Sequence, residues 1–205
     1  MYTLIFDANV PWDLDLKVNT LDEIMRLMDT INFKIYISSI NFYEMKYHTQ
    51  INLRKHKHVI IDEPNQNEYD GFRTALRQKG IILNAPDSAV LYTSHKFDAD
   101  YIVSSDTQVR LMSEKYANSY IKKVKPFHLM DMFSFLHGIN MIESNSCIKM
   151  SLKLYEHKEI PQMIEEYGKE LILNKQEQSK WIRNETKSSM DTFNSYERHI
   201  IEHLR

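Results

Sequence analysis

The sequence has 205 residues, a formal net charge of −2, 42% hydrophobic and 26% charged residues, values ordinary for a globular protein with a buried core. This balance gives no overall attraction to nucleic acid or membrane, so any polyanion must be bound by local basic stretches. The single cysteine, Cys147, excludes an internal disulfide and a cysteine-rich metal site, and it favours a cytoplasmic location. We find no signal-peptide pattern, no glycine-rich phosphate loop and no apolar run near the ~20 residues of a membrane span, so we expect no membrane partner.

The chain opens with a short apolar run, Leu4-Ile5-Phe6, that leads directly into Asp7. The run has the length and composition of a buried strand. Ligands of open α/β sheets bind outside the carboxyl ends of the strands. An acid at this point is therefore a candidate functional group.

Strand-like and helix-like segments alternate along the first 127 residues. A capping-box pattern at Thr20 and Glu23 begins the first predicted helix, and Ser38-Ser39 is expected to begin another that reaches about residue 50. The patterns predict further helices over 66–79, from 85 onward and over 107–116, and strands over 4–6, 34–38, 100–105 and 120–124. This order predicts an α/β domain with a parallel sheet and crossover helices, over residues 1–130.

Four carboxylates stand at comparable junctions of this alternation: Asp7, Glu44, Asp87 and Asp106. In a parallel sheet they would lie near one edge, where they would repel one another unless a cation offsets their charge. An oxygen-only ligand set suits Mg²⁺ or Mn²⁺. The acids also have structural explanations. Asp87 and Asp106 stand where helices begin, and an acid at that position stabilises the start of a helix.

The acids and their flanking segments IFDANV, SSINFYEM and APDSAVLYTSHKFDADYIVSSD resemble the PIN domain, a family of metal-dependent ribonucleases that includes toxin-type nucleases. The resemblance covers about residues 1–127 and implies a three-layer α/β/α domain. It implies that the four acids hold one or two Mg²⁺ or Mn²⁺ ions and that a metal-activated water hydrolyses RNA phosphodiester bonds. By the same resemblance, Ser104 and Asn9 would support the site through hydrogen bonds, and a small antitoxin protein is an expected partner.

Two stretches without acidic residues, one after Glu44 and one after Asp106, are candidate RNA-binding surfaces that we expect to flank the acids. Aromatic residues of the second stretch, Tyr116, Tyr120 and Phe127, could stack on unpaired bases. The predicted RNA-binding residues are Arg54, Lys55, Lys57, Lys122, Lys123 and Lys125.

Residues 131–205 are predicted to form an α-helical C-terminal extension whose apolar faces need a partner surface, in the domain, a second copy of the chain or another protein. Two other functions remain open. The first is a PIN-like interaction module with idle acids. The second is a phosphatase of the haloacid-dehalogenase type, although that family needs a second Asp where this chain has Asn9.

Overall fold

A computed structural model describes residues 2–154 of the chain. Its backbone divides into two compact units, Met1–Phe127 and His128–Arg205. No helix in the described range is long and apolar enough to cross a bilayer. The helices predicted beyond residue 154 lie outside the described residues.

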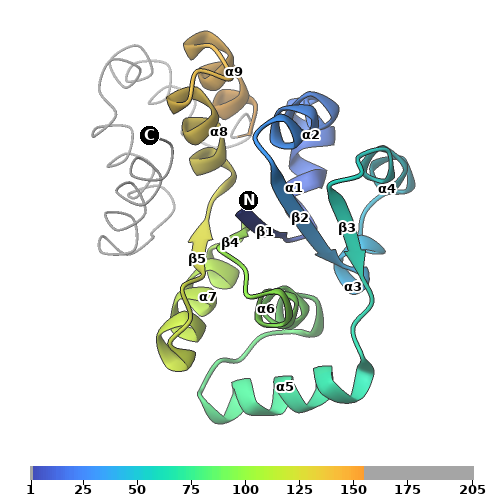
Figure 1. The fold of residues 1–205 in the computed structure, drawn as a ribbon, viewed down its shortest axis with the longest axis vertical. Helices are drawn as coiled ribbons and strands as arrows, with labels where there is room; N and C mark the ends of the chain where they lie inside the picture. Colours follow the sequence, from blue (N-terminus) through green and yellow to red (C-terminus); the bar gives the residue numbers. More distant parts are fainter. Residues whose placement is uncertain (1, 155–205) are drawn as a thin grey trace. The chain divides into compact units, whose positions relative to one another are not determined.

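The first unit is an α/β domain built on a five-stranded parallel sheet, as the sequence predicts (Figure 1). The strand order is β3-β2-β1-β4-β5, so β1 is the central strand. The strands are β1 (Tyr2–Phe6), β2 (Phe33–Ser38), β3 (Val59–Asp62), β4 (Tyr101–Val103) and β5 (Lys125–Phe127). We call the side of the sheet where these strands end its carboxyl edge and the opposite side its amino edge.

Helices connect consecutive strands. They are α1 (Asn9–Trp12), the π-helical segment η1 (Asp13–Val18), α2 (Leu21–Thr30), α3 (Ser39–Phe42), α4 (Tyr47–Arg54), α5 (Gln66–Gln78), α6 (Ala85–Phe97) and α7 (Thr107–Tyr120). The described part of the second unit consists of α8 (Leu129–Gly138) and α9 (Ser144–Leu154).

Both faces of the sheet are buried, which is why its strands are apolar at nearly every position. Ile5 and Ile102 lie in register on neighbouring strands and pack in one apolar cluster with Val90 and Leu91 of α6. Helix α2 packs against β2 and buries its own apolar stripe, which includes Met25. Figure 1 shows α6 and α7 on one side of the sheet and α1 and α2 on the other.

Several boundaries differ from the sequence predictions. The strand predicted over 120–124 is wrong, because α7 continues to Tyr120 and ends at Ile121, whose φ of 51° is left-handed. Strand β3 was not predicted, and neither were the helical turns of residues 9–18. The helix predicted from Ser39 to about residue 50 is two helices with a turn between them. The Thr20 side chain makes no capping hydrogen bond.

Candidate active site at the carboxyl edge

The four predicted acids all follow strand ends or begin elements at the carboxyl edge. Asp7 comes directly after β1, and Asp106 stands three residues beyond the end of β4. Asp87 lies in the first turn of α6. Glu44 lies in the turn between α3 and α4 rather than in a helix as predicted, and its side chain is exposed.

Asp7 is the centre of the group. Its carboxylate is buried and accepts hydrogen bonds from the backbone N–H of Ala8 at 2.7 Å, from Asn9 Nδ2 at 2.6 Å and from the Ser104 hydroxyl at 2.7 Å. Burial raises the pKa of Asp7 to about 6, the Ser104 hydrogen bond opposes this rise, and the negative charges of Asp87 and Asp106 add to it. The three hydrogen-bond donors therefore stabilise the ionised form of Asp7, whereas burial and the neighbouring charges favour its protonated form.

The other acids act on one another in the same way. Burial raises the pKa of Asp87, and the charges of Asp106 and Glu44 raise it further. The pKa of Glu44 is also raised, by partial burial of the carboxyl group. The charges that act on Asp7 and Asp87 are thus those of other carboxylates, as expected for a site that is completed by a cation.

Asp106 also has the structural role that its position suggested. Its Oδ1 accepts hydrogen bonds from the backbone N–H groups of Gln108 at 2.6 Å and Val109 at 3.3 Å, so it caps α7. The cap and the electrostatic effect on Asp7 and Asp87 are compatible, since an N-cap carboxylate keeps a second oxygen.

Ser104 and Asn9 both donate hydrogen bonds to Asp7. The Ser104 hydroxyl contacts Asp7 and accepts a hydrogen bond from the Asp106 backbone N–H at 3.0 Å. Asn9 donates to Asp7 and accepts from the Ser105 backbone N–H at 2.9 Å. These contacts join the segments after β1 and β4 and fix the orientation of the Asp7 carboxylate.

Asn41 is a residue that the sequence analysis missed. It is fully buried, and its Nδ2 lies 3.5 Å from Asp7 Oδ1 and 3.2 Å from the backbone oxygen of Pro86. Both partners are acceptors, so the orientation of the amide is set by the network. Asn41 thereby ties α3 to Asp7 and to the first turn of α6, which carries Asp87. A polar residue on the buried side of a short helix was the available signal.

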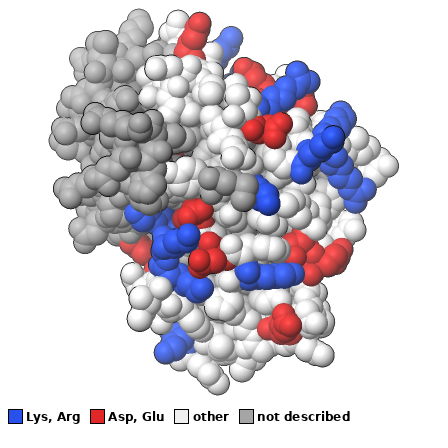
Figure 2. All heavy atoms as spheres, viewed as in Figure 1, with Lys and Arg blue, Asp and Glu red and all other residues white. Residues whose placement is uncertain are grey.

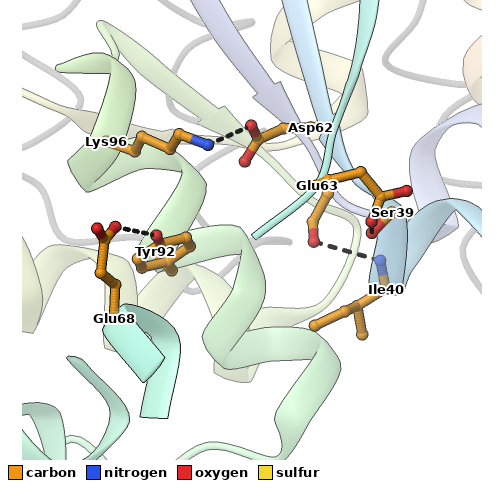
Figure 3. Close-up of polar contacts among 8 residues, drawn as sticks. Ser39, Ile40, Asp62, Glu63, Glu68, Tyr92 and Lys96 are labelled. Atoms are coloured by element: carbon orange, nitrogen blue, oxygen red, sulfur yellow. Dashed lines mark hydrogen bonds and ion pairs between the residues drawn. The ribbon is translucent and has the colours of Figure 1, made fainter. Parts of the chain in front are cut away.

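Helix α6 is fixed at its other turns by polar contacts with β3 and α5 (Figure 3). Lys96 Nζ lies 2.6 Å from the buried carboxylate of Asp62, and the Tyr92 hydroxyl donates to Glu68 at 3.0 Å. These contacts stabilise the helix that presents Asp87.

The donor set fits a hydrated hard cation. In residues 2–154, no three His, Cys, Asp or Glu side chains lie close enough together to enclose a metal ion. Mg²⁺ does not need such a cage, because it keeps several waters and binds through one or two carboxylates. Like charges act on Asp7 and Asp87, and the buried Asn41 Oδ1 has no hydrogen-bond partner within residues 2–154; both features suit a hydrated Mg²⁺ or Mn²⁺.

Five of the lysines predicted to bind RNA do not lie beside the acids. Lys55 and Lys57 lie in the segment that enters β3, and Lys125 begins β5, so these residues belong to the amino edge. Lys122 and Lys123 are there too: their Nζ atoms lie 3.3 Å from Asp98 Oδ1 and 3.2 Å from Asp100 Oδ1, just before β4. RNA binding by these residues stays a prediction, detached from the acidic site.

Two of the aromatic residues proposed to stack on bases are buried. Tyr116 and Phe127 have 0% and 3% of their surface exposed, and Tyr116 packs in the cluster beneath α6 and α7. Figure 2 shows Lys and Arg interspersed with Asp and Glu on the face in view, rather than gathered into one basic area.

Comparisons with known proteins give no family assignment. No protein-family model matches the chain, and no curated protein is significantly similar to it. A search of solved structures finds a chain in the crystal structure of VapBC2 from Rickettsia felis bound to a DNA fragment from their promoter, with 18% sequence identity and a TM-score of 0.41. The match covers 62% of this chain and 98% of that one. A structural similarity this low does not support an inference about function. The inference about function therefore rests on the geometry of the site.

Proposed function

We propose that this protein is a divalent-metal-dependent endoribonuclease with a PIN-type site formed by Asp7, Glu44, Asp87 and Asp106. The observation that supports the proposal is that burial raises the pKa of Asp7 and Asp87, acids of separate segments, and that the charges of neighbouring carboxylates raise both values further. Acids that repel one another in the apo state are destabilising unless a cation makes use of them.

Each of the four acids has its own role in the proposed metal site. Asp7, held by Ser104, Asn9 and the Ala8 backbone, supplies a fixed carboxylate, and Asp87 and Asp106 supply two more around it. Glu44 is exposed, which leaves its carboxylate free to move toward a ligand. Mg²⁺ or Mn²⁺ at these carboxylates would lower the pKa of a water molecule and offset charge on the phosphate.

RNA as the substrate, and an antitoxin-type protein as a partner, follow from the resemblance of residues 1–127 to PIN domains. A toxin and an RNA-processing enzyme would use the same site. A homo-oligomer formed through the C-terminal extension, residues 131–205, is a further proposal.

Cleavage of end-labelled single-stranded RNA tests the proposal. We expect cleavage in Mn²⁺ or Mg²⁺, none in EDTA, and 5′-phosphate ends on the products. Asp7→Asn and Asp106→Asn should abolish it, and Asn at position 106 preserves helix capping, so the second loss is not a folding effect. Asp98→Asn is the matched control: this exposed acid ends α6 at the amino edge in a left-handed conformation that Asn tolerates. Failure of every metal to support cleavage, with no metal binding that depends on Asp7, would contradict the proposal.

The same experiment separates the alternatives. A phosphatase should hydrolyse a simple phosphomonoester, but the position of its second acid is filled by Asn9, whose amide is engaged with Asp7 and Ser105. An idle interaction module should bind no divalent ion through these acids.

A further inference from the structure

Three aromatic side chains stand out because they are exposed. Tyr47, Tyr43 and Trp12 have 76%, 64% and 37% of their surface accessible. Every other Phe, Tyr or Trp in the described range is buried or partly buried. Exposing rings of this size forgoes the stabilisation of burial, so a group of them indicates a binding surface.

All three rings lie on the side of the sheet that carries the acids. Trp12 ends α1, which begins two residues after Asp7. Tyr43 directly precedes Glu44, and Tyr47 is the first residue of α4, which contacts α1. The Tyr43 ring is supported edge to face, 5.6 Å from the ring of Phe42, a fully buried residue. The three rings thus belong to the segments that follow Asp7 and flank Glu44.

Lysine is interleaved with these rings. Lys46 lies between Tyr43 and Tyr47 in the chain, and its Nζ lies 5.6 Å from the centroid of the Trp12 ring. Lys46 is exposed and has no ion-pair partner within residues 2–154. This differs from Lys122 and Lys123, which are paired with aspartates. We call Trp12, Tyr43, Lys46 and Tyr47 the aromatic surface.

We propose that the aromatic surface binds single-stranded RNA, with its rings stacking on unpaired bases and Lys46 contacting the backbone phosphate. This inference rests on the proposed nuclease function and names its substrate as unpaired RNA. A base in a duplex is already stacked on both sides, whereas a single strand can splay its bases onto aromatic rings. The unpaired cation beside the rings favours a polyanion over an apolar protein segment, and the neighbouring acids are where a bound strand would be cut.

Binding is measured by fluorescence anisotropy in EDTA, where cleavage is absent, with a labelled single strand of about ten nucleotides and its duplex. We expect the single strand to bind more tightly than the duplex. Tyr43→Ala and Tyr47→Ala should each weaken single-strand binding by about fivefold or more, the effect of removing a base-stacking ring. Tyr43→Phe and Tyr47→Phe keep the ring and should keep the affinity. Ile82→Ala is the matched control, since Ile82 is an apolar residue 70% exposed elsewhere on the domain.

The fluorescence of Trp12 reports RNA binding at the aromatic surface directly. The chain has two tryptophans, so Trp181→Phe leaves Trp12 as the single reporter. Stacked bases should quench its fluorescence on titration with single-stranded RNA, and the duplex should quench it much less.

Equal affinity for single strand and duplex, or alanine variants that bind as the wild type does, would overturn the inference. If those variants instead change the oligomeric state and leave RNA affinity unaltered, the surface is an interface between copies, and the inference is again overturned. A protein that binds single strands through these rings but cleaves nothing in Mg²⁺ or Mn²⁺ would refute the nuclease and leave the binding surface standing.

Discussion

At the amino edge of the sheet, basic and acidic side chains lie next to one another. Lys122 and Lys123 approach Asp98 and Asp100 within 3.3 Å, so charge is compensated inside the protein. At the carboxyl edge, burial raises the pKa of Asp7 and Asp87, and the charges of other acids raise both values further. Aspartates at the amino edge are therefore paired with lysines, whereas aspartates at the carboxyl edge lie among other acids. Under the proposed function, the carboxyl edge is therefore where a cation would bind.

The largest expected effect comes from comparing two variants, each of which removes one negative charge from one edge of the sheet. Asp87→Asn should lower cleavage about 1000-fold, because loss of one carboxylate from a metal site costs several kcal/mol of transition-state stabilisation. Manganese affinity, measured by calorimetry, should fall in parallel. Asp98→Asn should leave both unchanged. If the two variants behave alike, the edges are not functionally different.

The second test uses the pKa of Asp7. The pKa is about 6 in the folded protein against 3.8 for the ordinary group, so the folded state holds this proton more tightly than the unfolded state does. Asp7 therefore contributes stability below pH 4 that is lost as the pH rises through about 6. A difference of about two pKa units corresponds to about 3 kcal/mol.

Chemical denaturation of the wild type and Asp7→Asn at pH 4 and pH 7.5, in EDTA, measures this effect. The wild type should lose about 2.5 kcal/mol relative to the variant between these pH values, because Asp7 of the unfolded chain is already about half ionised at pH 4. Mg²⁺ or Mn²⁺ should raise the melting temperature of the wild type at pH 7.5 and not at pH 4, because protonated carboxyls do not bind the ion. A pH-independent difference would mean that Asp7 is not held in this repulsive setting.

The sequence predicted the parallel sheet and the positions of its acids because both depend on local patterns. A short apolar run followed by Asp7, and a Pro-Asp helix start at Asp87, are readable without tertiary contacts. The edge of the sheet on which a loop lies depends on every element before it. Because β3 was not predicted, the sequence did not show that Lys55 and Lys57 precede a strand. Exposure is equally non-local: Tyr116 and Tyr43 look alike in sequence, yet only the second reaches solvent.

Asn41 is the third test, and its effect should be smaller. Asn41→Leu keeps the volume but removes both donors, which leaves the partly buried Pro86 carbonyl and one side of Asp7 without this partner. We expect metal affinity to fall about 10-fold, in the range for residues that orient ligands. Thr93→Val is the control. Thr93 is buried on α6 and its hydroxyl oxygen has no hydrogen-bond partner among the residues that the structure describes, so this change should be nearly neutral. Unaltered metal affinity in Asn41→Leu would limit Asn41 to a packing role.

The smallest effect separates cations that contact RNA from cations that pair with acids. Lys46→Gln should reduce the slope of log affinity against log salt concentration by about one, the signature of a lost phosphate contact. Lys122→Gln combined with Lys123→Gln should leave that slope unchanged and alter RNA affinity less than about twofold, because these ammonium groups already face aspartates at the amino edge. The affinities come from anisotropy titrations at several salt concentrations. A slope reduced by the paired lysines and not by Lys46 would place the RNA at the opposite edge, and the acids would then lie away from the bound strand.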